Sequence, residues 1–169
     1  MDVLEAIRTR RSIRQYEPRP VPDDLVHKVL AAGMAAPSAR NSQPWHFVVV
    51  RDPALLAQVP RINPNAEMAG RAPLAILVCA DPGLEISPGY WPVDCAAATE
   101  NMLLAAHGLG LGAVWTGIYP REDRMAGYRG LLGIPDRVVP HSLVVLGYAA
   151  ERRPAEDRYR PDRVHENRW

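Results

Sequence analysis

Three arginines and one serine lie within a five-residue run near the start of the chain, Arg10-Arg11-Ser12-Ile13-Arg14. The planar guanidinium group of arginine binds phosphate through paired hydrogen bonds, and a serine hydroxyl can add a further bond. The run therefore predicts an anion-binding segment, although the same residues would also form an ordinary solvated basic turn. The candidate ligands are Arg10, Arg11, Ser12 and Arg14.

A polar loop with a proline at each end follows at residues 37–44. Pro37 and Pro44 stiffen this loop, which precedes an apolar run. A rigid polar loop suits a flat polar ligand that carries a polyol chain, although turn formation alone would explain the same composition. The side chains that could donate or accept hydrogen bonds here are Ser38, Asn41, Ser42 and Gln43.

A third segment of interest is Trp115-Thr116-Gly117, at the end of an apolar, β-branched run. Because Gly117 has no side chain, its backbone N–H could approach a ligand closely. A bulge glycine at a strand end explains the same residue without any ligand.

Several other chemistries are excluded by the absence of their motifs. The chain contains no G-x-G-x-x-G dinucleotide motif, no Walker A loop, no G-x-S-x-G elbow and no histidine pair at zinc-binding spacing. With one phenylalanine it has no aromatic platform for RNA. Cys79 and Cys95 form no C-x-x-C pair.

Composition indicates an ordinary globular protein with a hydrophobic core. Its 169 residues allow one domain, 47% of them are hydrophobic, and the net charge of +1 favours neither nucleic acid nor an anionic membrane as a partner. No leader peptide or membrane span is recognisable, so we expect a cytoplasmic protein. We expect a domain at residues 1–150 and, because the composition becomes polar, a separate extension at 151–169.

Hydrophobic periodicity predicts an α+β or α/β domain whose strand order the spacing does not decide. Asp2 is a candidate cap for the first helix, and Asp23 or Asp24 for the second. The apolar run 74–80 indicates a strand covered on both faces, and the alanine-rich run 93–107 indicates a helix closely approached by another. The predicted helices are 2–9, 23–36, 93–107 and 121–132, and the predicted strands are 45–50, 74–80, 113–118 and 142–148.

Taken together, these segments resemble the FMN-dependent nitroreductase family. The matching motifs are R-R-S-x-R near residue 10, P-S-A-R-N-S-Q-P-W-H-F near residue 40, and D-x-x-A-A-x-E-N-M-L-L-A-A-H-x-L-G-L-G-x-x-W-x-G from 94 to 117. The resemblance implies an α+β sandwich with a mixed, mostly antiparallel sheet flanked by helices. It also implies an interlocked homodimer with FMN at the interface, in which residues 151–169 clasp the partner subunit.

The resemblance also implies roles for individual residues. Arg10 and Ser12 match positions that hold FMN, Arg14 matches a basic residue near the flavin pyrimidine edge, and Arg11 occupies a position that varies. The loop residues match a segment that covers the flavin from the other chain: Pro37, Ser38, Ala39 and Asn41, with Gln43 close behind. Trp115, Thr116 and Gly117 match the stretch beside the flavin ring, and Arg158 and Arg160 a second basic pair at the phosphate, for which Arg152 or Arg153 could substitute.

The expected activity is transfer of hydride from NADH or NADPH, through flavin N5, to a nitroaromatic, quinone or flavin acceptor by a ping-pong mechanism. The short segment 81–93 leaves little room for the helical excursion that caps the substrate channel in longer members. Two alternatives stay open: another flavin reaction on the same fold, such as dehalogenation or flavin cleavage, and a non-catalytic flavin-binding protein.

Overall fold

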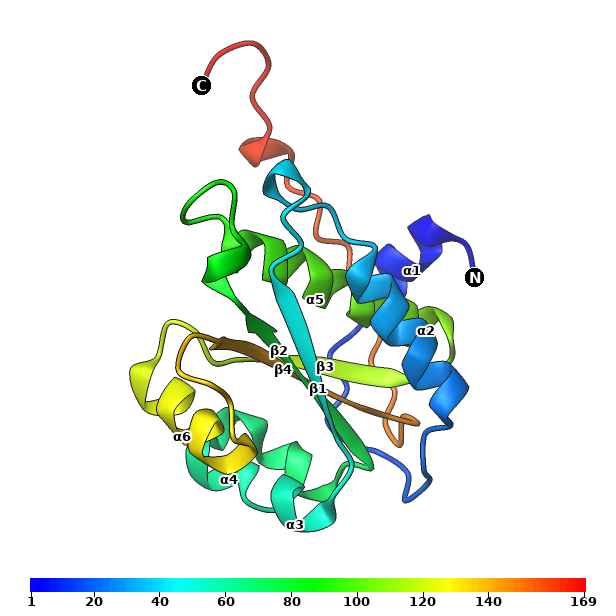
Figure 1. The fold of residues 1–169 in the computed structure, drawn as a ribbon. Helices are drawn as coiled ribbons and strands as arrows, with labels where there is room; N and C mark the ends of the chain where they lie inside the picture. Colours follow the sequence, from blue (N-terminus) through cyan, green and yellow to red (C-terminus); the bar gives the residue numbers. More distant parts are fainter.

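A four-stranded sheet in the order β1-β2-β4-β3 separates two layers of helices (Figure 1). The computed structural model describes residues 1–169. Every neighbouring pair of strands is antiparallel. The strands are β1 (Trp45–Val50), β2 (Leu74–Ala80), β3 (Gly112–Gly117) and β4 (Val139–Gly147).

The two longest helices cover one face of the sheet, and shorter helices cover the other (Figure 1). The long pair is α2 (Asp23–Met34) and α5 (Trp91–Gly108). On the opposite face lie α3 (Pro53–Leu56), α4 (Val59–Ile62) and α6 (Glu122–Leu132), while α1 (Val3–Thr9) contacts α5. Short 3₁₀ turns occupy Ala39–Asn41, Pro64–Arg71, Pro82–Leu84 and Pro161–Arg163.

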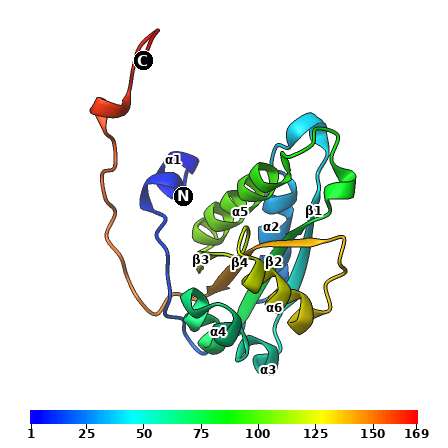
Figure 2. The same ribbon diagram turned by 90° about the vertical axis from the view of Figure 1, so that its left-hand side faces the viewer.

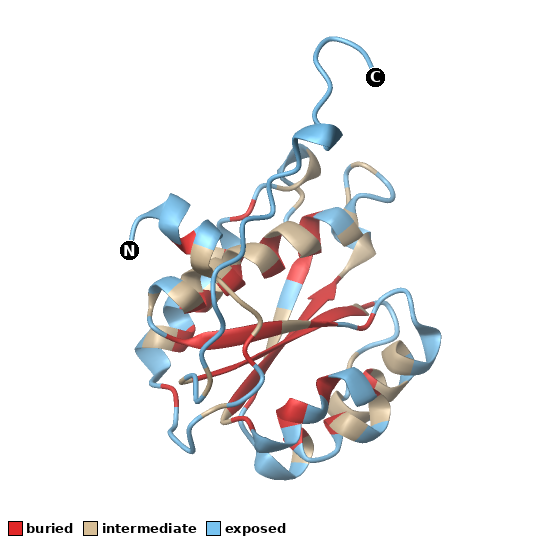
Figure 3. Cartoon of the chain, turned by 180° about the vertical axis from the view of Figure 1, so that it is seen from behind, coloured by how far each residue is buried: buried red, intermediate tan, exposed pale blue.

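Strand β2 joins the two halves of the core, because all of its residues are buried (Figure 3). Leu74, Ile76 and Val78 pack with α2 and α5, whereas Leu77 and Cys79 pack with the α3, α4 and α6 layer. Strand side chains alternate between the two faces of a sheet, so a strand covered twice must be apolar throughout. The prediction for residues 74–80 is confirmed.

The close approach of α2 to α5 is also confirmed. A methyl group at Gly33 of α2 would lie 2.9 Å from Cγ of Met102 on α5, so the glycine allows this approach. Helix α5 then ends where Gly110 takes a φ of 79° and the Leu111 N–H donates to the Ala106 carbonyl at 2.8 Å. This left-handed C-terminal motif turns the chain directly into β3.

The outer edge of β3 is partly covered by the segment that follows α1. Ser12 forms a parallel bridge with Ala113, whose carbonyl accepts the Ile13 N–H at 3.0 Å. Past β4, Ala149 bridges to Tyr16, and the chain continues as an extended tail (Figure 2). The tail runs beside α1 and away from the sheet, with residues 152–169 exposed (Figure 3).

Two predictions about the fold are corrected. The sheet was expected to be mixed and mostly antiparallel; the pairs among its four strands are all antiparallel, and the isolated bridge at Ser12 is the one parallel pairing. Helix α2 begins at Asp23 after Pro22, and neither Asp23 nor Asp24 caps it. The Asp23 carboxylate instead accepts from Arg51 Nη2 at 2.7 Å, which draws it away from the helix end.

The helical turns between residues 53 and 71 were not predicted. Asp52 and Asn63 each stand before a proline, and their side chains accept from the N–H groups of Ala54 and Asn65. A capping residue followed by proline is a sequence signal for a helix start, and it was available at both positions. None of the helices is long and apolar enough to cross a bilayer.

We expect Gly112→Ala to destabilise the fold where residues 12–13 meet β3. The added methyl group would lie 2.7 Å from Ile13 Cγ2, 2.9 Å from Ile13 Cβ and 3.1 Å from Ala149 Cβ. Overpacking of this kind costs about 1–3 kcal/mol of the free energy of unfolding, which urea denaturation would measure.

Gly130→Ala in α6 is the matched control, because a methyl group there would meet nothing within 4 Å. Replacing an exposed helical glycine by alanine stabilises by about 0.5–1 kcal/mol. Equal stabilities for the two variants would contradict the close contact at Gly112.

Candidate functional site

The two arginine-rich segments lie side by side and line two neighbouring cavities. One cavity, of about 350 Å³, is lined entirely by polar residues and Pro154. The other, of about 630 Å³, contains Arg10 and shares Arg11 and Arg158 with the first. Lining the smaller cavity are Arg11, Ser12, Arg14, Arg153, Pro154, Glu156 and Arg158.

The cations around these cavities differ in how far they are already paired. Arg10 Nε lies 3.5 Å from Glu100 on α5, and Arg158 pairs with Glu156 at 3.0 Å. The guanidinium of Arg14 has no such ion pair and lines the smaller cavity beside Ser12. Arg14 and Ser12 are therefore the groups with most hydrogen-bonding capacity left for an anion.

Arg11 has a structural task that the sequence analysis did not anticipate. Its guanidinium donates to the carbonyls of Arg8 and Arg10 at the end of α1, and to those of Pro154 and Glu156 in the tail. A guanidinium has five N–H donors, so four of them are committed to the backbone. Arg11 thus binds the tail to the segment 10–14 and forms the shared wall of both cavities.

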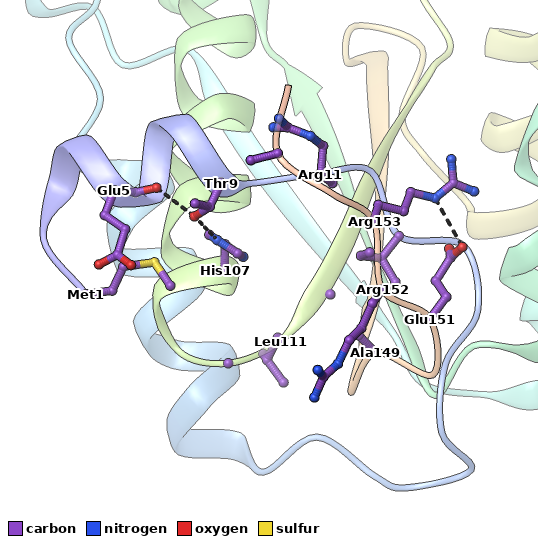
Figure 4. A pocket seen from close by; sticks show the side chains of 14 residues that line it. Met1, Glu5, Thr9, Arg11, His107, Leu111, Ala149, Glu151, Arg152 and Arg153 are labelled. Atoms are coloured by element: carbon purple, nitrogen blue, oxygen red, sulfur yellow. Dashed lines mark hydrogen bonds and ion pairs between the residues drawn. The ribbon is translucent and has the colours of Figure 1, made fainter. Parts of the chain in front are cut away.

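Glu151 fastens the base of the tail in the same place. Its carboxylate accepts the Arg14 N–H and pairs with Arg153 Nε at 3.1 Å (Figure 4). The hydrogen bond from the Arg14 backbone lowers the pKa of this carboxyl below its ordinary value. Behind these residues lies a further cavity of about 520 Å³, between the end of α5, α1 and the tail (Figure 4).

At the end of β3 the exposed groups are those of the backbone, because Thr116 is buried and Gly117 has no side chain. The Thr116 hydroxyl is buried and donates to the Leu143 carbonyl at 3.1 Å, so it is directed into the sheet. Gly117 is exposed, and a methyl group added to it would meet nothing within 4 Å. Neither packing nor a positive φ within the chain requires glycine there, so the open space above Gly117 suits a ligand.

An aromatic cluster that the sequence analysis missed adjoins this strand end. His141 on β4 lies within 5.9–6.4 Å of the rings of Trp115, Trp91 and Tyr119, measured between ring centroids. Burial lowers the pKa of His141 to about 4, so its imidazole is neutral at ordinary pH. Within this cluster the ring of His141 lies against that of Trp115, and Tyr119 is partly exposed to solvent.

The loop at residues 37–43 is held in an unusual conformation. Arg40, Asn41 and Gln43 have φ values of 52°, 58° and 47°, in the left-handed region that non-glycine residues rarely adopt. Asp94, in the first turn of α5, accepts the Ala39 N–H at 2.9 Å and is only 4% exposed. Strained backbone of this kind is concentrated at functional sites, where the surroundings enforce it.

The predicted site residues therefore form two groups within one chain. Arg10, Ser12 and Arg14 lie with Arg11 and Arg158 around the cavities, and Ser12 is bridged to Ala113 at the start of β3, the strand that also contains Trp115, Thr116 and Gly117. The loop residues Pro37, Ser38, Ala39, Asn41 and Gln43 lie at the start of α5 and line neither cavity. Arg160 lies outside both groups and pairs with Asp162 at 3.4 Å.

The fold is an α+β sandwich, with an antiparallel sheet between two helical layers and a cation-lined cavity at the segment bridged to β3. The chain belongs to the Nitroreductase family, whose family model matches residues 7–148. It is thus an NAD(P)H-dependent nitroreductase/flavin oxidoreductase by family, and the sequence resemblance is confirmed.

Known relatives match over nearly the full chain. A protein of Methanothermobacter thermautotrophicus, provisionally named an NADH dehydrogenase/NAD(P)H nitroreductase, is 53% identical and covers 100% of this chain and 88% of its own. A Parabacteroides distasonis crystal structure with the same provisional name has a TM-score of 0.95 at 39% identity, covering 99% and 98% of the two chains. A provisionally named nitroreductase of Desulfovibrio desulfuricans, solved in complex with FMN, has a TM-score of 0.85 at 32% identity, covering 100% and 98%.

We expect Arg11→Met to release the tail, because it removes all four donors to the backbone carbonyls. Arg11→Lys should release the tail almost as fully, since one ammonium group cannot reach all four carbonyls. Loss of charged hydrogen bonds worth about 1.5 kcal/mol should speed chymotryptic cleavage at Tyr159 about tenfold. Arg152→Met, at an exposed neighbouring position, is the control. Equal rates of cleavage in all variants would refute the attachment of the tail by Arg11.

Asp94→Ala should loosen the loop, because it leaves the Ala39 N–H without its buried acceptor. We expect a loss of about 1–3 kcal/mol in the free energy of unfolding, measured by urea denaturation, and partial recovery in Asp94→Asn, which retains an acceptor. Asp123→Asn is the control, since that side chain is exposed and contacts only Arg121. Equal losses at both positions would argue against a specific role for Asp94.

Proposed function

We propose that this protein is an FMN-dependent oxidoreductase that transfers hydride from NADH or NADPH to nitroaromatic, quinone or flavin acceptors. The observation that carries the proposal is the cavity, lined by polar residues and Pro154, in which Ser12 and the unpaired Arg14 lie with Arg158. Ser12 is bridged to Ala113 of β3, the strand that ends at the exposed Gly117. The complex of the Desulfovibrio desulfuricans relative with FMN supports the same assignment.

The donor set fits the phosphate and ribityl groups of FMN. A phosphate dianion needs cations and N–H or O–H donors, which Arg10, Arg158 and Ser12 supply from two segments. The smaller cavity contains one carboxylate, Glu156, which is already paired with Arg158. We propose Arg10, Ser12, Arg14 and Arg158 as ligands, with Arg11 holding the tail against them.

The neighbouring groups suit the isoalloxazine ring. Bound FMN supplies the hydride chemistry at its N5 atom. Arg14 would favour negative charge at the pyrimidine edge of the ring, and the open surface at Gly117 would let the ring lie against the backbone of β3. We assign no reacting role to the thiols, because burial raises the pKa values of Cys79 and Cys95 to about 12 and keeps both protonated.

We further propose that a second copy of the chain completes the site. The loop 37–43 lines neither cavity of its own chain, so it would cover the flavin bound to a partner. Helix α1 presents Val3, Leu4 and Ile7 at exposures of 68%, 74% and 55%, an apolar stripe suited to an interface. The exposed tail 151–169 would clasp the same partner.

The test is the absorbance spectrum of the purified protein between about 350 and 500 nm, before and after anaerobic NAD(P)H. We expect a flavin spectrum that bleaches on reduction. Arg10→Ala with Arg14→Ala should remove about 3 kcal/mol of binding free energy, weakening FMN binding about a hundredfold, so that the double variant purifies colourless.

Arg71→Ala with Arg137→Ala is the matched control, since both arginines are exposed, lie on other surfaces and pair with single carboxylates. This control should stay yellow and reducible. A wild-type protein that takes up no FMN when supplied in excess would refute the proposed function, and a yellow Arg10/Arg14 variant would refute the assignment of those ligands.

A further inference from the structure

The carbonyl of Gly117 is held by two side chains from the layer opposite α5. Arg124 Nη1, from the first half of α6, donates to it at 2.8 Å, and Asn63 Nδ2 donates at 3.3 Å. Asn63 is fully buried, and its own Oδ1 accepts the Asn65 N–H at 3.2 Å, which fixes the orientation of its amide. Gly117 is thus the one residue at the end of β3 whose carbonyl has two side-chain donors.

The hydrogen-bonding pattern of β3 determines which way the Gly117 backbone faces. The Ile118 N–H donates inward to His141 of β4, and the Ala113 carbonyl accepts outward from Ile13. Alternate residues of an antiparallel strand face opposite edges, so Gly117 faces outward like Ala113. Its N–H and its carbonyl therefore both lie on the outer edge of the sheet, where the carbonyl is bound and the N–H is open.

A glycine at a strand end is the residue least able to keep such an orientation by itself. It has no side chain to pack, and its backbone has more conformational freedom than that of any other residue. A methyl group at Gly117 would meet nothing within 4 Å, so no neighbour restrains it sterically. The peptide plane before Gly117 belongs to the β3–β4 ladder, and the plane after it is held by the Ile118 N–H bond to His141 and by the two side-chain donors at the Gly117 carbonyl.

We propose that Arg124 is a positioning residue that, together with Asn63, holds the Gly117 carbonyl and so maintains the strand conformation at Gly117 in which its N–H faces outward, toward the bound flavin ring. The inference rests on the proposed function, because it assigns that N–H to the cofactor. Arg124 also adds a positive charge near the strand end, which favours the more negative, reduced form of the flavin. Nothing in the FMN phosphate site depends on it.

The test compares Arg124→Met and Arg124→Lys with the wild type and with Arg121→Met. Arg121 is the matched control, because it lies three residues away and its side chain pairs only with Asp123. The measurements are the Kd for FMN, the midpoint potential of the bound flavin, and amide hydrogen exchange at Gly117 in the FMN-free protein. Thermal unfolding of the FMN-free protein reports any general loss of structure.

We expect Arg124→Met to weaken FMN binding about tenfold, because the less restrained Gly117 backbone must be ordered on binding, and to shift the midpoint potential to a more negative value, because a positive charge is lost. Exchange at Gly117 should become faster without FMN, while Arg121→Met matches the wild type. Arg124→Lys should recover part of the affinity and the potential, since an ammonium can still donate to the carbonyl.

An Arg124→Met protein with unchanged FMN affinity, potential and exchange at Gly117 would overturn the inference. So would a fall in thermal stability alone, because that result would make Arg124 a purely structural residue. Failure of the wild type to bind FMN is a separate outcome, which refutes the proposed function itself and this inference with it.

Discussion

The outer edge of strand β3 is the constraint on which the rest of the site depends. An edge strand has backbone N–H and carbonyl groups with no neighbouring strand to bind them. In this protein the first part of that edge is bound by residues 12–13, and the Gly117 carbonyl at its end is bound by Arg124 and Asn63. Gly117 lies further along the same strand, so one sheet edge both anchors the segment that lines the cation-lined cavities and exposes the backbone proposed for the flavin ring.

Much of this arrangement could be predicted from the sequence, because it depends on local patterns. The apolar run 74–80 indicated a strand buried on both faces, and the glycines after residue 107 indicated the end of α5. The basic run at residues 10–14 predicted an anion site, and three of its residues line the smaller cavity. In each case the local structure is determined by a few residues that are adjacent in the sequence.

What could not be predicted depends on contacts between distant segments. Arg11 looked like one more phosphate ligand, yet the fold places four carbonyls from two segments around its guanidinium. Asp94, Asn63 and Arg124 were not singled out, because a single carboxylate, amide or cation has no local pattern that identifies its partner. Their partners lie 55, 54 and 7 residues away along the chain, and folding alone brings them together.

The hydrogen bonds from Arg11 to the tail have a consequence for sequence variation. Its partners in residues 154–156 are main-chain carbonyls, which every amino acid possesses. The attachment is therefore indifferent to which side chains the tail presents at those positions, so substitutions could accumulate there without detaching it. The outward surface of this arm can therefore vary while its attachment to residues 8–11 stays constant.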